Sequence, residues 1–301
     1  MSVRKRNAMT VIFLAGCLTA LGTTAFAQAG QNPQQQNQQN PNQQPQQPSA
    51  NKQQKPADTG SSLEVPKNQA PANAEEDAAV KEFQTIPSND VPKKISSGED
   101  FLKKYPDSRY RPVVYSALVF AYIQSNNSEK AFEVGDKEVA LKPDDVQTMA
   151  VLSQTIPRAL TANTPEPEKR LAKAETYAKR AIEITPTLPK PEGMADQNFL
   201  MAKNETLTMA HSGLGLVYFR LGKFNDAIPE LEQSVKIDPN PAPDPVNLYV
   251  LGMSNQKASH YEEAAAVFTK CAAITSGLQA VCKNGAEEAK KQSSTQLSSP
   301  K

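Results

Sequence analysis

The chain has 301 residues, a formal net charge of +1 and a hydrophobic fraction of 38%. A charge this close to zero argues against a dedicated nucleic-acid binder, because such proteins carry a clear basic excess. Three cysteines are too few for a disulfide-dense secreted scaffold. The hydrophobic fraction lies below the ~45–50% that is typical of globular chains. A polar segment therefore dilutes an ordinary folded domain.

The N-terminal segment 1–27 has the three parts of an export signal. Residues 4–6 are basic, residues 8–21 are almost wholly apolar, and Ala25 and Ala27 supply the small residues of a cleavage site. We therefore expect residues 1–27 to be removed as a signal peptide. The remainder is then exported and acts in the periplasm or elsewhere in the cell envelope.

Two other interpretations of the same segment stay open. Leu14, Ala15, Gly16 and Cys17 resemble the lipobox of bacterial lipoproteins, in which the cysteine is lipidated and becomes the mature N-terminus. The apolar run is also close to the ~17–25 residues that span a bilayer, so an uncleaved anchor is the third interpretation. Membrane contact is expected only through such a lipid anchor or signal anchor.

A polar linker is expected over 28–74. Between Gln31 and Gln54, the only residues other than Gln, Asn and Pro are Ser49, Ala50 and Lys52. Such a composition cannot bury a core and predicts a disordered tether. The linker would either let the folded domain stand away from a membrane or cell wall, or act as an inert spacer that keeps the chain soluble.

The rest of the chain is repetitive, and one unit is clearest. His211, Leu214, Gly215 and Tyr218 are followed by Ala227 and Leu231, and Pro239 closes the unit. This spacing resembles the tetratricopeptide repeat (TPR), a helical hairpin of about 34 residues. His211 stands at the family's aromatic position and Leu231 at its Phe position. Gly215 and Ala227 would let the two helices approach closely, and Gly222 would form the turn.

Further units carry the pattern with more departures. One follows directly, with Leu248, Leu251, Gly252, Ala264 and Phe268 at the same spacings. An earlier unit over 112–143 has Val119 and Gly135 at the Gly and Phe positions. A degenerate unit over 145–186 and an N-terminal helical pair over 75–106 complete the series.

The predicted fold is therefore all-α: an α-solenoid of TPR-like helix-turn-helix repeats over 75–290, with a C-terminal capping helix and a disordered tether before it. A disordered tail is expected over 291–301. Four helical pairs and a terminal helix exceed the ~3 repeats that such folds need for stability.

The two cysteines of the repeat region stand on either side of a predicted turn. Cys271 falls on the last repeat's second helix and Cys282 on the capping helix, with Ser276 and Gly277 between them. In an antiparallel hairpin this symmetry places the two sulfurs opposite each other, and an exported protein meets oxidising conditions. A disulfide and a pair of buried thiols are both compatible with this placement.

Stacked helical pairs form a concave groove lined by the first helix of each pair. In the resembled family such positions hold peptides or helices of partner proteins. Helical spacing places eleven residues there: Ser116, Phe120, Ile123, Ser212, Leu216, Phe219, Arg220, Tyr249, Met253, Gln256 and Lys257. Alternatively, several of them pack against the extra turns over 194–207 or against the N-terminal helices.

Signals for catalysis are nearly absent. The histidines His211 and His260 lack a matching Cys, Ser or carboxylate motif, and no metal-ligand or phosphate-binding motif occurs. No catalytic residue, metal or cofactor is expected, so the sequence predicts a scaffold or adaptor that binds a protein or peptide. One alternative is an outer-membrane or cell-wall assembly lipoprotein, since residues 101–110 resemble such proteins. A secreted hydrolase is the alternative of another class.

Overall fold

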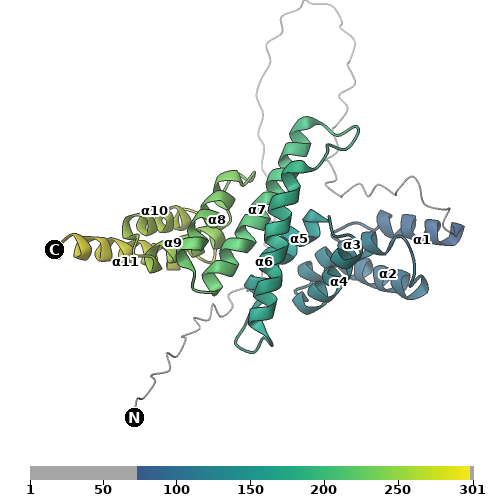
Figure 1. Ribbon diagram of the computed structural model, residues 1–301, viewed down its shortest axis with the longest axis horizontal. Coiled ribbons are helices and arrows are strands. Elements are labelled where there is room, and N and C mark those ends of the chain that lie inside the picture. Colours follow the sequence, from purple (N-terminus) through teal and green to yellow (C-terminus); the bar gives the residue numbers. More distant parts are fainter. Residues whose placement is uncertain (1–72, 299–301) are drawn as a thin grey trace, which may run out of the picture. The chain divides into compact units, whose positions relative to one another are not determined.

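The computed structural model describes residues 73–298, and Figure 1 shows them as coloured ribbons. The expected signal peptide over 1–27, with Cys17, lies outside the described residues, as does the expected linker up to residue 72. Within 73–298 the chain forms α-helices and one short 3₁₀ helix but no strand. The predicted all-α fold is confirmed for this part of the chain.

The helices follow one another with short connections. Their bounds are α1 Ala74–Thr85, α2 Val91–Lys104, α3 Arg111–Gln124, α4 Ser128–Leu141, α5 Val146–Ala159, α6 Pro167–Ile184, η1 Thr185–Thr187, α7 Asp196–Arg220, α8 Phe224–Ile237, α9 Pro245–Lys257, α10 Tyr261–Ala272 and α11 Gln279–Ser298. Each helix from α1 to α11 packs on the next one in the chain. This nearest-neighbour packing is that of an α-solenoid.

Side-chain caps fix where many of these helices begin. Asn73, Asp90, Asn127, Asp145 and Asp244 each precede a helix and accept a hydrogen bond from a backbone N–H of its first turn. An N-terminal turn leaves such N–H groups without helical partners, so a short polar side chain at this position stabilises the helix start.

The same backbone turn joins three of the helical pairs. Asn126, Gly222 and Ser259 adopt left-handed φ values of 57°, 74° and 67° at equivalent places. In each turn the next residue donates its N–H to the carbonyl five positions back, over 2.8, 2.9 and 2.8 Å. This is the hydrogen bond of a Schellman helix end. Three different residues at the left-handed position thus build one repeated turn.

Small residues hold the two helices of a pair together. A Cβ placed on Gly215 would lie 2.6 Å from the Leu231 side chain, and one on Gly252 would lie 2.7 Å from the Phe268 ring. In the α3–α4 pair the large and the small residue change places. Val119, which is fully buried, stands where the other pairs have glycine. Gly135 stands at the Phe position, and Leu152 of α5 fills its missing side chain.

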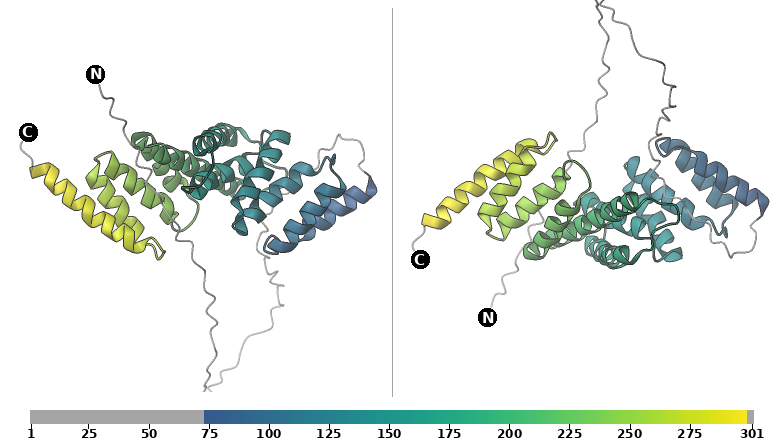
Figure 2. Two further views of the ribbon diagram at one scale, coloured as in Figure 1. Left: turned by 90° about the horizontal axis from the view of Figure 1, so that it is seen from below. Right: turned by 90° about the horizontal axis from the view of Figure 1, so that it is seen from above.

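The C-terminal end is closed by α11, which lies along α10 in Figure 2. Cys271 and Cys282 form a disulfide between these two helices, with their Cα atoms 5.7 Å apart. The tail expected over 291–301 needs correction, because α11 continues to Ser298. Gln292 of this extension accepts a hydrogen bond from Gln256, and Ser293 donates one to Glu262. These contacts to the last repeat favour helix over coil.

Candidate partner-binding site

The predicted groove along the first helices is interrupted where α5 meets α7. These two helices pack directly on each other, whereas α3 and α5, or α7 and α9, touch only lightly. Gly213 makes the close approach possible, because a Cβ there would lie 2.3 Å from the Ser153 hydroxyl and 2.6 Å from its backbone. The surface on the first helices is therefore split into an α3 part and an α9 part.

Two predicted groove residues of α7 are buried in the fold, and their assignment to an open surface is wrong. Ser212 is fully buried and Leu216 is 6% exposed. Ser212 accepts a hydrogen bond from Gln154 of α5, and Leu216 belongs to the core of the α7–α9 region. The physical reason differs between the two: α5 and α9 cover Ser212, whereas Leu216 points into the core that α7 shares with α8 and α9.

Arg220 is also used inside the fold rather than at an open groove. Its guanidinium donates to the carbonyl oxygens of Pro157 and Leu160 at the end of α5, over 3.1 and 3.5 Å. Those carbonyls have no helical partner at a helix C-terminus, so the cation satisfies them. Burial lowers the pKa of Arg220 from its usual value. A charge-reversing substitution here would disturb the fold before it reported on binding.

The α3 part of the surface holds three predicted residues. Phe120 is 36% exposed, which is high for a side chain of this size. Ile123 is half-buried against the N-terminal core, and Ser116 lies 3.3 Å from the Thr148 hydroxyl of α5. This patch is apolar at Phe120 and offers little hydrogen bonding.

The α9 part holds the last four predicted residues, of which only Lys257 is exposed. Tyr249 packs on Phe268 with ring centroids 6.0 Å apart, and burial raises the pKa of its hydroxyl. Met253 is half-buried against the C-terminal core, and Gln256 donates to Gln292 of α11 over 2.8 Å. The capping helix thus covers much of this predicted face. Phe219, from α7, lies edge-on to Phe224 with centroids 5.7 Å apart.

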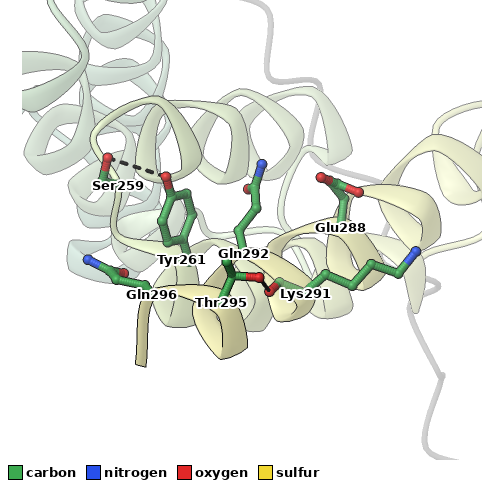
Figure 3. Close-up of a pocket in the computed structure, with 7 residues that line it drawn as sticks. All are labelled: Ser259, Tyr261, Glu288, Lys291, Gln292, Thr295 and Gln296. Atoms are coloured by element: carbon green, nitrogen blue, oxygen red, sulfur yellow. Dashed lines mark hydrogen bonds between the residues drawn. The ribbon is translucent and has the colours of Figure 1, made fainter. Parts of the chain in front are cut away.

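A polar hollow of about 380 Å³ lies next to this end of α9 (Figure 3). The turn residue Ser259 and Tyr261 of α10 form one side, and the Tyr261 hydroxyl donates to Ser259 over 3.5 Å. The last turns of α11 form the other side through Glu288, Lys291, Gln292, Thr295 and Gln296. The lining offers hydrogen-bond donors and acceptors around one aromatic ring but no nucleophile with a neighbouring base. It suits polar contact with a partner.

A buried polar network that the sequence did not reveal ties four helices together. Asn247 of α9 is 1% exposed. Its side-chain oxygen accepts hydrogen bonds from Ser212 over 2.7 Å and from Arg158 over 3.1 Å, while its amide nitrogen donates to Ser234. Arg158 also pairs with Asp244, the N-cap of α9, at 2.6 Å. The only sequence signal was a set of polar residues within otherwise apolar helix faces.

Residues 209–241 match the family model described as "Tetratricopeptide repeat". They cover the end of α7, the left-handed turn at Gly222 and all of α8. This stretch is a tetratricopeptide repeat. The α9–α10 pair repeats its turn and its glycine–side chain contact, so the tetratricopeptide geometry extends beyond the matched residues.

Several solved structures resemble the chain at low identity. A thermophilic TPR protein of Thermus thermophilus is 18% identical, with a TM-score of 0.44 and coverage of 71% of this chain and 98% of that one. PilW, a type IV pilus biogenesis factor, is 16% identical, with a TM-score of 0.48 and coverage of 74% and 93%. No curated protein matches the chain significantly. Similarities of this size do not bear on function.

The two histidines of the described residues lie in different surroundings. His211 pairs with Glu230 at 2.7 Å across the α7–α8 hairpin, and His260 is exposed in the next turn. Among residues 73–298 no cluster of three or more His, Cys, Asp or Glu side chains could hold a metal ion. None of the helices in this range has the length and apolar character needed to cross a bilayer.

One buried carboxyl stands apart from these pairs. Glu138 of α4 is fully buried, and neither of its oxygens has a partner in good hydrogen-bond geometry, although the Asp145 and Thr148 side chains lie nearby. Burial, together with the neighbouring carboxylate of Asp145, raises the pKa of Glu138 to about 9. The side chain is therefore neutral at physiological pH. It lies inside the packed repeats rather than in a cleft.

Proposed function

We propose that this chain is a non-enzymatic scaffold, exported to the bacterial cell envelope, that uses its helical repeats to bind a partner protein. The observation that carries the proposal is the tetratricopeptide repeat at 209–241 within a stack of similar helical pairs. Proteins built from this repeat mediate protein–protein interaction, because each pair exposes one helical face after its core contacts are made.

The binding surface consists of two separate parts. The α3 part presents Phe120 as an apolar anchor, and the α9 part presents Lys257, two residues before Ser259 of the polar hollow of Figure 3. A partner that touches both would need an apolar contact at one end and hydrogen-bonding or anionic groups at the other. An extended or amphipathic segment meets that need better than a uniformly charged one.

Export is supported by the N-terminal sequence and by the disulfide. The basic, apolar and small-residue parts of segment 1–27 form a secretory signal. Cys271 and Cys282 stand at bonding distance, and disulfides persist mainly outside the cytosol. Sequencing the N-terminus of the mature protein tests this part: a start at Gln28 supports export by cleavage, and a start at Met1 in a cytosolic fraction rejects it.

Affinity capture from the native host tests partner binding. The tagged chain is compared with the double variant Phe120→Asp/Lys257→Glu, and Lys283→Glu serves as the control because Lys283 is exposed on α11 and does not line the polar hollow. We expect one or a few envelope proteins to co-purify with wild type and with the control, and to fall at least tenfold with the double variant. Equal recovery from all three would reject this surface.

A lipid anchor is the second candidate, favoured by the lipobox-like sequence at 14–17. In that case the protein is an assembly lipoprotein of the outer membrane or cell wall. Labelling with a radioactive fatty acid distinguishes the two: label that is lost in Cys17→Ser assigns the lipoprotein, and unlabelled wild type assigns the cleaved signal peptide.

A further inference from the structure

A second surface, on the last repeats, has the features of a docking site. A slot of about 280 Å³ runs between α8 and α10 with α9 as its floor. Leu248 and Leu251 form the floor, and Val235 and Val267 form the two walls. The helical spacings of three residues in α9, and of three to four in the walls, align these side chains along one direction.

The size of the slot limits what it can hold. Small-molecule and cofactor sites usually measure ~300–1,000 Å³ and enclose most of the ligand. The slot lies at the lower end of that range and is open to solvent, and four of its seven lining residues are apolar. It is therefore matched to one or two apolar side chains of a polypeptide rather than to a cofactor.

The rim of the slot carries uncompensated positive charge. Lys236 and Lys270 stand on the two wall helices, with Glu232 one turn before Lys236. Among the described residues none of these three charges has an ion-pair or hydrogen-bond partner. Glu232 and Lys236 have the spacing of a helical ion pair, but they do not form one. Even if they did, Lys270 would remain, so the rim has a net charge of +1.

The lysines of α6 have a different arrangement. There Lys169, Lys173 and Lys179 each have a carboxylate partner within the fold. The two rim lysines lie in the last turns of their helices, where a cation is favourable in any case. The favourable position at a helix end explains why these residues are positively charged, but not why both border an apolar slot. The experiment must therefore separate an effect on stability from an effect on binding.

We propose that the α8–α10 slot docks a segment of a partner protein in which an apolar side chain lies next to an acidic residue. The apolar side chain enters between Val235 and Val267, and the carboxylate meets Lys236 and Lys270. This inference rests on the proposed scaffold function and adds a second, chemically distinct contact to it. The two fail separately, because capture through Phe120 and Lys257 does not involve the slot.

Panning a phage-displayed library of random heptapeptides on the purified full chain tests the proposal. Wild type and Lys236→Arg/Lys270→Arg should both enrich peptides with Leu, Ile or Phe within two positions of Asp or Glu. The charge-reversed Lys236→Glu/Lys270→Glu should lose that preference and bind the enriched acidic peptide at least about tenfold more weakly. Lys283→Glu, which reverses a charge elsewhere, should bind as wild type does.

Several results would overturn the proposal. Identical peptides enriched by wild type and by the charge-reversed variant would remove the role of the lysines. Loss of binding in Lys257→Glu instead would move the site to the α9 part of the first surface. The sequence Leu63, Glu64 and Val65 also has apolar residues next to an acidic one. If the chain self-associates and Leu63→Asp abolishes this, the occupant is that segment of a second copy. Val267→Phe fills the slot without changing charge, so it should also block the peptide, and undiminished binding would exclude the slot.

Discussion

Replacing Glu138 by Gln should make the protein more stable at neutral pH. Glu138 is fully buried without a partner in good hydrogen-bond geometry, and its pKa is raised from 4.5 to about 9. Below pH 4.5 the carboxyl is protonated in both the folded and the unfolded chain. Between pH 4.5 and 9 the carboxyl is ionised in the unfolded chain but protonated in the folded one. The chain must therefore take up a proton from solution when it folds. Stability then falls as pH rises through this range.

The magnitude follows from the same pKa values. For each pH unit over which only the folded chain holds the proton, the unfolding free energy falls by about 1.4 kcal/mol. At pH 7.5, three units above the unfolded pKa, wild type should therefore be destabilised by up to about 4 kcal/mol relative to a neutral side chain of the same shape. Glutamine is such a side chain, so the gain in stability from Glu138→Gln should be near zero at pH 4.5 and grow with pH.

Urea unfolding followed by circular dichroism at several pH values between 4.5 and 8.5 measures this difference. Ionisable groups that do not interact with Glu138 contribute equally to both proteins and cancel, and Asp145 is the neighbouring group that does interact with it. Glu133→Gln on the same helix is the matched control, since Glu133 is exposed and paired with Lys137 at 2.7 Å. It should change stability by no more than about 0.5 kcal/mol. A pH-independent effect of Glu138→Gln, or a variant less stable than wild type at pH 7.5, would refute the reasoning.

Three further substitutions test the packing. Replacing Cys271 and Cys282 by Ser should lower the unfolding free energy by about 3 kcal/mol without reductant, from the loop that the disulfide closes; unchanged urea midpoints would contradict a bond in the purified protein. Gly252→Val should cost about 1–3 kcal/mol because the new side chain overlaps a buried ring, whereas Gly277→Ala meets open space and should be neutral; equal thermal melting of the two would contradict the close approach. Asn247→Ala should cost about 2–3 kcal/mol by leaving its buried partners unsatisfied, and a loss under about 0.5 kcal/mol in denaturant titration would mean that the network contributes little.

The repeat architecture could be predicted from sequence because it depends on local spacing. Gly215 and Gly252 mark the close approach of two helices, and Gly222 marks the turn between them. These features act within about 34 residues, so a single unit displays all of them. The turns at Asn126 and Ser259 were harder to recognise, since a left-handed backbone at non-glycine residues has a weaker sequence signature.

The binding surface could be predicted only in part because it depends on contacts between repeats. Helical spacing predicted an open position for Ser212 and Leu216, but Ser212 lies under α5 and Leu216 lies in the core with α8 and α9. The small residues from Ala210 to Gly215 were the available signal for such a contact. Burial of Glu138 and the partners of Asn247 involve helices far apart in the chain, which periodicity within one helix does not report.

The central claim is that the exposed parts of the first helices contact another protein in the cell. A photo-crosslinking amino acid placed at Phe120 or at Lys257, in the native host, measures this directly. Glu183, exposed on the outer face of α6, is the control position. The scaffold account predicts a discrete adduct with an envelope protein from Phe120, Lys257 or both, and none from Glu183. Absence of any adduct at the first two positions, or the same adducts at all three, would contradict it.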